Sequence, residues 1–140
     1  MPLVPQETTA VPQTARETQL TALKAGALAT ATVHLYTNDF TPSAVSVVGD
    51  FIEAAYTGYT ASAVTGWTAN DLQVDGTVTT DSTNVMTFVG PVAGSGPNVY
   101  GYYLLGTGTG TPLLSAARFS SPFSLVDDHD VLNMVASYVI

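Results

Sequence analysis

The fold is decided by the stretch from Asn98 to Leu125, which reads NVYGYYLLGTGTGTPLLSAARFSSPFSL. Its first eight residues are mostly β-branched, aromatic or aliphatic, which suits a pleated and largely buried strand. The Gly/Thr run that follows is typical of a loop, and residues 113–119 have the right length to pair back antiparallel. Because the loop is longer than a two-residue hairpin turn, it leaves the register open. We therefore expect this hairpin to form the centre of an all-β domain.

The composition predicts a single globular domain with an unusually weak charge. The chain has 140 residues, and its 46% hydrophobic content is sufficient for a core. Only 10% of its residues are charged, against about 25% in typical domains, and the net charge is −8. Lys and Arg occur only as Arg16, Lys24 and Arg118. Because no basic patch exists to displace counterions, we expect no binding to nucleic acid.

The sequence lacks cysteine and lacks the patterns of a membrane span and of a secretory signal. Cysteine is absent, so neither a disulfide nor a thiolate site can form. No apolar run reaches the roughly 18 residues that a spanning helix needs, and we expect no membrane partner. The start, MPLVPQETTAVPQ, lacks the basic and apolar regions of a secretory signal. If the protein works outside a cell, release inside an assembled particle is one way for it to get there.

Residues 1–13 carry Pro2, Pro5 and Pro12 among Thr, Gln and Val. This composition favours an extended N-terminal arm that has no core of its own. We expect such an arm to dock on an assembly, and the alternative is an arm folded back on its own domain. Residues 14–140 are then expected to form a single β-rich domain.

The domain is expected to begin with a short helix over residues 14–25. Thr14 followed by Glu17 matches a capping box, and Gly26 is a plausible C-cap. Residues 27–36 alternate with period two and predict a strand. For residues 43–51 we prefer a short helix with Val45, Val48 and Ile52 facing the core, and a strand is the competing interpretation.

The remaining sequence predicts strands over residues 53–60, 71–79, 84–89 and 131–140, with Gly58 at a bulge or close backbone approach. With the central hairpin this gives six to eight short strands, one or two short helices and an extended arm. Strands at this spacing favour a β-sandwich or a small β-barrel.

Catalytic chemistry finds little support in the sequence. We interpret His34 as an exposed strand residue, and His129 as part of an acidic, solvated turn, Asp127 to Asp130. This turn carries Ca²⁺-type ligands, but their spacing fits no EF-hand loop. No GxSxG elbow appears, and the Gly/Thr run lacks the Lys of a phosphate loop. We therefore expect no enzyme, no catalytic or metal-ligating residue and no cofactor.

Aromatic side chains are the candidates for binding. Exposed Tyr and Trp beside Asn and Asp are typical of carbohydrate-binding surfaces, although Tyr is equally common in cores and subunit contacts. The core or contact interpretation is the favoured one. The candidates are Tyr36, Tyr56, Tyr59, Trp67, Tyr100, Tyr102 and Tyr103.

An ordered set of segments resembles a known group of proteins. After the expected helix come HLYTNDFTPS (residues 34–43), DFIEAAYTGYT (residues 50–60), Trp67 and then VYGYYLL with LLSAARFSSPFSL. In this order they resemble small structural proteins encoded in virion gene clusters of tailed bacteriophages. The resemblance implies capsid decoration proteins or minor tail components, and it carries no catalytic motif.

We therefore expect a capsid decoration (cement) protein on the virion surface. It would bridge capsomers of the major capsid protein through its arm and β-domain, as a homo-oligomer and most simply a trimer. The alternatives are a tail or fibre adhesin that binds glycans, and a head–tail or baseplate connector. The residues expected to contact partners are Pro2, Val4, Pro5, Val11, Pro12, Tyr36, Trp67 and Tyr103.

Overall fold

The computed structural model describes residues 10–107 and 111–140, and within these ranges the protein is mainly β. One α-helix, α1 (Gln13–Ala25), and two short 3₁₀ turns, η1 (Ala27–Thr30) and η2 (Val48–Asp50), accompany the strands. The nine strands of the described ranges are β1 (Thr32–Tyr36), β2 (Ser62–Ala63), β3 (Asp71–Leu72), β4 (Val78–Asp81), β5 (Met86–Val89), β6 (Asn98–Leu105), β7 (Leu113–Ser124), β8 (Val131–Met134) and β9 (Ser137–Val139).

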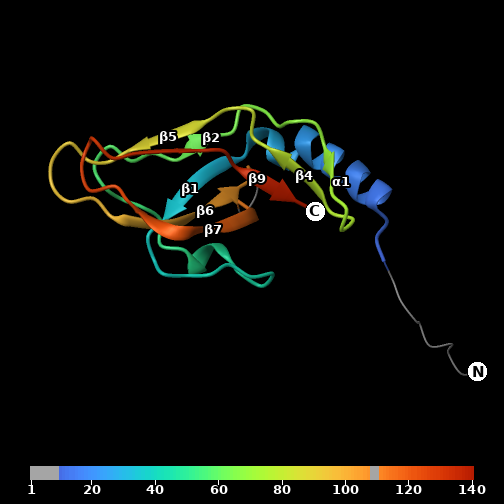
Figure 1. Ribbon diagram of the computed structural model, residues 1–140, viewed down its shortest axis with the longest axis horizontal. Coiled ribbons are helices and arrows are strands. Elements are labelled where there is room, and N and C mark those ends of the chain that lie inside the picture. The colour runs from blue at the N-terminus through green and yellow to red at the C-terminus, as the bar shows by residue number, and fades with distance from the viewer. Residues whose placement is uncertain (1–9, 108–110) are drawn as a thin grey trace, which may run out of the picture.

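The strands form three antiparallel sheets (Figure 1). The largest has the order β2-β1-β6-β7, the second has the order β3-β4-β9, and β5 pairs with β8 as a two-stranded ribbon. The sheets do not close into a barrel. The expectation of a mainly β fold is confirmed, and of its two forms the structure is consistent with a small β-sandwich accompanied by a helix.

The predicted central hairpin is confirmed. β6 pairs antiparallel with β7, and Tyr103 lies opposite Ala116. The register shifts between Val99 and Gly101 and again between Leu104 and Leu105. β1 pairs with the other edge of β6 through five consecutive residue pairs, so that β6 lies inside the sheet. The sequence-central strand is therefore also central in the fold.

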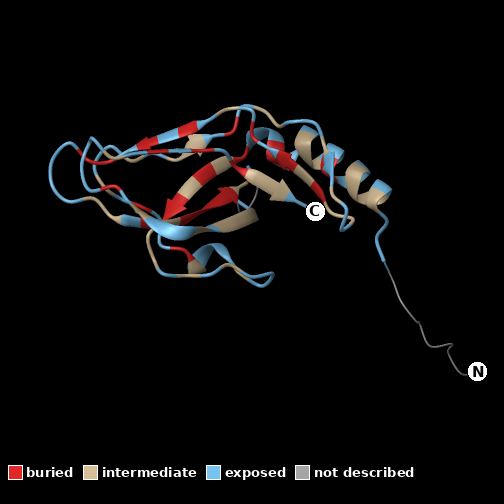
Figure 2. Cartoon of the chain, in the orientation of Figure 1, coloured by how far each residue is buried: buried red, intermediate tan, exposed pale blue. Residues whose placement is uncertain are grey.

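Two hydrophobic clusters hold the layers together. The larger lies between the inner face of the four-stranded sheet and the β5–β8 ribbon, which contributes Met86, Phe88, Leu132 and Met134. The smaller lies under α1 and joins Leu20, Leu28 and Val78. Figure 2 shows how buried and exposed residues alternate along the strands that line the larger cluster.

The helix was predicted to within one residue, but its expected capping box was wrong. Pro12 occupies the N-cap position and makes no side-chain capping hydrogen bond, whereas Thr14 already lies inside the helix. A proline suits this position because the first helical N–H groups lack partners in any case. Gly26 follows the helix as predicted, and its N–H donates to Leu23 O at 3.1 Å.

The predicted strand over residues 27–36 is only partly correct. Residues 27–30 form η1, and the strand starts at Thr32. The fully buried Leu28 packs with Leu20 of α1. The alternating apolar pattern of residues 27–36 therefore spans two elements, η1 with its contact to α1 and then the strand β1.

The preferred helix over residues 43–51 was wrong, and so was the competing strand. The segment is irregular apart from η2, and it turns Val45 (86% exposed), Val48 and Ile52 (62% exposed) toward solvent instead of the core. Side chains of the segment form hydrogen bonds with its own backbone; for example, Asp50 Oδ2 accepts the Val47 N–H at 2.9 Å. Such local bonds compete with regular secondary structure.

Three other strand predictions need correction. Residues 53–60 contain a single bridge, Glu53 to Tyr36, and then a turn in which Gly58 has a φ of +92°. Residues 71–79 form a hairpin around Asp75-Gly76, with Gly76 at a φ of +85°. Residues 131–140 divide into β8 and β9, which pair with β5 and β4 in different sheets.

Candidate interaction surface

The loop of residues 37–52, here called the anchored loop, lies on the outer face of the four-stranded sheet (Figure 1). Beneath it lies a third cluster, in which Tyr36, Phe51 and Tyr103 are buried. The Phe51 and Tyr103 rings stack with centroids 4.8 Å apart, and Phe40 meets Phe51 edge-on at 5.3 Å. Aromatic pairs at such distances contribute about 0.5–1.5 kcal/mol each beyond the burial of their area. The loop therefore has a small hydrophobic core of its own.

Polar groups tie the two arms of the anchored loop together. Asn38 Nδ2 donates to Asp50 O at 2.9 Å, and Asn38 Oδ1 accepts the Ile52 N–H at 2.9 Å. The Thr37 N–H donates to Ile52 O at 2.8 Å. The hydroxyl of buried Tyr36 donates to Phe40 O at 3.0 Å. Because the bonds of Asn38 and Thr37 join the two arms and the Tyr36 bond holds the first arm to the sheet, the loop backbone is fixed largely without regular secondary structure.

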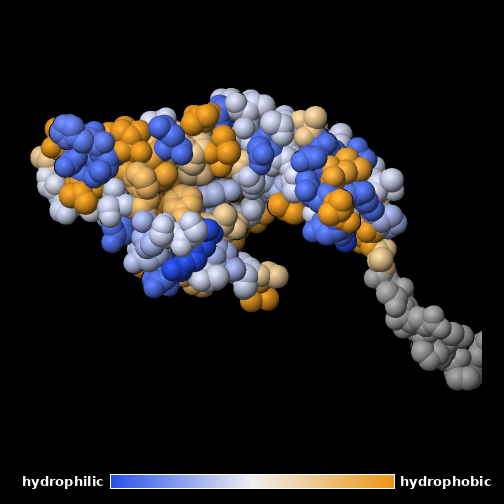
Figure 3. Space-filling model, viewed as in Figure 1, coloured by the Kyte–Doolittle hydropathy of each residue, from blue (hydrophilic) through white to orange (hydrophobic). Residues whose placement is uncertain are grey.

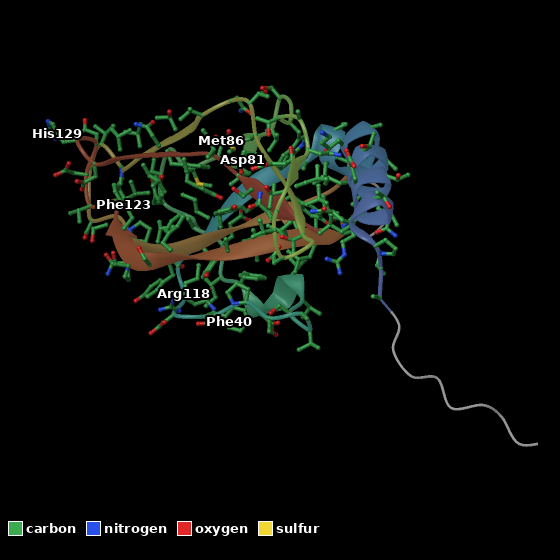
Figure 4. The ribbon with its side chains drawn as sticks, turned by 45° about the vertical axis from the view of Figure 1, so that its right-hand side comes forward. Phe40, Asp81, Met86, Arg118, Phe123 and His129 are labelled. Carbon is green, nitrogen blue, oxygen red and sulfur yellow. The ribbon has the colours of Figure 1, made fainter. Side chains whose placement is uncertain are left out.

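Arg118 of β7 holds the loop from the side of the sheet. Its guanidinium pairs with Asp39 at 2.6 Å, reaches the Thr41 hydroxyl at 3.5 Å, and lies 5.5 Å from the centre of the Tyr100 ring. Figure 4 shows Arg118 and Phe40 on the same side of the sheet. A planar cation suits this position, because it stacks on an aromatic face while donating hydrogen bonds in its plane.

A second polar network closes the sheet end of the loop. His34 Nδ1 lies 2.5 Å from Glu53 Oε1, and His34 Nε2 lies 2.8 Å from the Thr32 hydroxyl. The Tyr59 hydroxyl donates to Glu53 Oε1 at 3.0 Å and accepts the Leu35 N–H. Burial first, and then the charge of Glu53, raises the pKa of Tyr59 well above its ordinary value. The phenol therefore stays a hydrogen-bond donor at neutral pH.

The interpretation of His34 as an exposed strand residue was wrong. Its side chain is only 16% exposed, and its ring stacks on Tyr103 with centroids 5.2 Å apart. Although Thr32, His34 and Glu53 follow the hydroxyl–imidazole–carboxylate order of some hydrolases, each group is used to brace the sheet and the loop. We therefore interpret the network as structural.

On this rigid base the anchored loop exposes apolar side chains. Val45 is 86% exposed and Val47 59%, while Val48 and Ile52 also face solvent. A groove of about 450 Å³ runs between residues 42–46 and residues 113–116 of β7. The Leu and Ala side chains of β7 in that groove belong to the edge strand of the sheet. An exposed apolar loop beside an open strand edge is typical of a protein–protein contact.

The structure distributes the predicted partner-binding residues unevenly. Pro2, Val4 and Pro5 lie outside the described residues. Val11 and Pro12 are exposed just before α1. Tyr36 and Tyr103 are 0% and 3% exposed, so they offer no surface to a partner, contrary to the expectation of contact residues. Both rings pack under the anchored loop, and the Tyr36 hydroxyl donates to Phe40 O.

Trp67 also packs against the interior of the domain. Its Nε1–H donates to Leu28 O at 2.8 Å, and its ring packs against both the larger cluster and the one under α1. An indole used in this way is not a free platform for a sugar ring. Sequence reasoning missed the residues that do face outward, because Val45, Val48 and Ile52 match the apolar pattern of a core segment.

The Asp127 to Asp130 turn is held by its own side chains. Asp130 Oδ2 accepts the N–H groups of Val126 and Asp127, and Asp127 Oδ1 accepts the His129 N–H at 2.9 Å. This last bond is the main reason that the pKa of Asp127 is lowered. Asp127, Asp128 and His129 are all exposed, and they place one ligand atom each within 4.8 Å of one another. Their exposure is that of the predicted solvated turn.

Comparison with protein-family models, curated proteins and solved structures finds no match to this chain. Across residues 10–107 and 111–140, no helix has the length and apolar character needed to cross a bilayer.

Proposed function

We propose that this chain is a structural component of a tailed-bacteriophage virion, a capsid decoration protein that contacts the shell through its anchored loop. One observation carries the proposal. The loop is fixed from below by buried aromatic rings and crossing hydrogen bonds, yet it turns Val45, Val47 and Ile52 to solvent.

A loop built in this way is suited to binding another protein. Binding normally costs the entropy of ordering loops and side chains, and a loop that is already ordered avoids much of that cost. β-branched valine loses little side-chain freedom on contact. The groove beside β7 adds a concave surface next to the exposed valines.

The resemblance to virion proteins involves the same residues. Two of its segments, residues 34–43 and 50–60, contain His34, Asn38, Phe51 and Glu53, which take part in the contacts beneath and around the loop. The weak surface charge fits a protein that is covered by neighbours on a lattice, where many weak contacts give avidity. A trimeric state and an N-terminal arm laid on the major capsid protein belong to the same proposal.

The proposal is tested by counting copies of the chain in purified particles, using quantitative mass spectrometry against the major shell protein. We expect hundreds of copies, close to stoichiometric with the shell. A count between about three and a few dozen copies would indicate a tail component instead of a decoration protein. No copies at all would overturn the virion assignment.

The contact itself is tested by a double substitution, Val45→Ser with Val47→Ser, which makes the loop polar without touching its anchors. We expect particle occupancy to fall at least tenfold. The matched control is Val74→Ser, because Val74 lies fully exposed beside the Asp75-Gly76 turn. Equal occupancy for the double variant and the control would contradict a contact through the loop.

A further inference from the structure

The β5–β8 ribbon carries a second apolar surface. Its burial alternates strictly, with Met86, Phe88, Leu132 and Met134 inward. The residues next to these inward positions face solvent. Four of them are valines, Val85 (62% exposed), Val89 (43%), Val131 (40%) and Val135 (45%). We call these four residues the valine face.

The four residues of the valine face lie on one side of the ribbon, as one pair at each end. Val89 lies directly opposite Val131 in the antiparallel register. Val85 and Val135 follow one position beyond the paired residues at the other end. Between the two ends, Thr87 Oγ1 donates to Asn133 Oδ1 at 2.7 Å, and this polar pair separates the two pairs of valines. Single exposed valines are common on surfaces, but four valines on one side of two paired strands indicate a contact surface.

The valine face and the anchored loop lie on opposite sides of the molecule. The four-stranded sheet has the loop on its outer face and the ribbon against its inner face (Figure 1). Figure 4 agrees, with Met86 of the ribbon on one side of the large sheet and Phe40 of the loop on the other. In Figure 3, orange side chains lie toward both ends of the β5 region, with blue side chains between them. The protein therefore offers two apolar surfaces facing in opposite directions.

The charges around the valine face determine what can bind there. Asp127 and Asp128 are exposed in the turn just before Val131, and the Gly90 N–H donates to Asp130 O, which ties β5 to that turn. The three Lys and Arg side chains are used elsewhere, with Arg16 on Gly76 O, Lys24 on Thr68 O and Arg118 on Asp39. A second copy of this chain, with a net charge of −8, would bring carboxylates toward carboxylates.

We infer that the valine face docks on a basic protein surface, one that sets Lys or Arg beside aliphatic side chains, and that the chain bridges this surface and the surface that the anchored loop contacts. The identity of the partner, the shell protein, rests on the proposed function. The valine face alone is too small for the roughly 800 Å² per partner of a stable complex. Binding on two sides supplies the remaining affinity through effective concentration.

The test measures binding of purified protein to shells from which the chain has been removed, at several salt concentrations. The ribbon variant combines Val89→Thr with Val131→Thr, which keeps side-chain shape and strand preference while adding hydroxyls. The charge variant combines Asp127→Asn with Asp128→Asn. The matched control is Val139→Thr, an exposed valine on β9. Circular dichroism and thermal unfolding verify that each variant is folded.

We expect the ribbon variant to bind at least tenfold more weakly than the control. The charge variant should lose much of the salt dependence that the natural chain shows, because screened attraction is what salt weakens. If the natural chain and the ribbon variant bind equally well, the inference that the valine face is a docking surface is overturned, while the proposed function stands. If the natural chain does not bind to the shells at all, both are overturned.

Discussion

At the scale of single residues, the position of Tyr36 depends on a glycine. Tyr36 lies opposite Gly101 in the register of β1 and β6, and its ring covers the space where a side chain would be. A Cβ at position 101 would meet Ala117 O and would lie 2.6 Å from the Tyr36 hydroxyl. Since that hydroxyl donates to Phe40 O, the glycine also determines how the anchored loop is held.

Gly101→Ala is therefore expected to destabilise the fold by about 2–4 kcal/mol, because backbone on one side and a buried ring on the other prevent relaxation. Chemical denaturation measures the change in the free energy of unfolding. The matched control is Gly49→Ala, where an added Cβ meets nothing within 4 Å. A loss of less than 1 kcal/mol for Gly101→Ala would contradict the packing described here.

The buried tyrosines predict a loss of stability in alkali. Burial, and then the charge of Glu53, raises the pKa of Tyr103 to about 12. Between pH 10 and 12 the phenol ionises in the unfolded chain and stays protonated in the folded one, so the unfolded state binds fewer protons and stability falls as pH rises.

Denaturation midpoints measured from pH 8 to 11.5 should show this fall, and Tyr103→Phe should reduce it. Phenylalanine keeps the stacking on His34 and Phe51 but has no ionisable group. A stability that is flat above pH 10, in the natural chain, would be inconsistent with a buried phenol at this position.

At the scale of elements, the anchored loop depends on Asn38 more than on any helix or strand. Its amide joins the two arms of the loop at Asp50 and Ile52. Asn38→Ala leaves both backbone groups without these partners, at a cost of about 1–3 kcal/mol. We expect faster hydrogen exchange over residues 39–50 and unchanged exchange in β6. The control is Ser120→Ala on the exposed part of β7, and equal exchange in the two variants would refute the role of Asn38.

Elements with strong local signals were predictable from the sequence. The β6–β7 hairpin follows from aromatic and apolar runs of the right length, and the end of α1 follows from Gly26; both elements are present, although the capping box expected for α1 does not form. The Asp75-Gly76 turn was also readable, because Asp-Gly between β-type residues is a strong hairpin signal, but the prediction ran one strand through it. The division of residues 131–140 carries no such signal, because only the pairing of β8 and β9 with different sheets creates it.

The candidate surface was less predictable than the fold. Apolar residues at 45, 48 and 52 indicated a core segment, since sequence hydrophobicity does not distinguish a buried face from an exposed contact surface. Conversely, Tyr36 and Tyr103 were chosen as contact residues because tyrosine suits interfaces, and the structure buries both under the loop. The aromatic rings fill the space beneath the loop, and the valines lie on its outer side.

At the scale of the whole molecule, three layers follow one another in space. The anchored loop covers one face of the four-stranded sheet, and the β5–β8 ribbon covers the other (Figure 1). Apolar side chains are exposed on both outer layers, whereas most charge is acidic and lies at turns and loops. This arrangement is that of a spacer between two surfaces, in agreement with the proposed role as a bridge on a shell.

A cryo-EM reconstruction of the particle that carries this chain tests the central claim most directly. The account predicts density for the β-domain in which the anchored loop faces one shell subunit and the valine face approaches basic residues of another. Density in which Val45, Val47 and the β5–β8 ribbon all face solvent would contradict it.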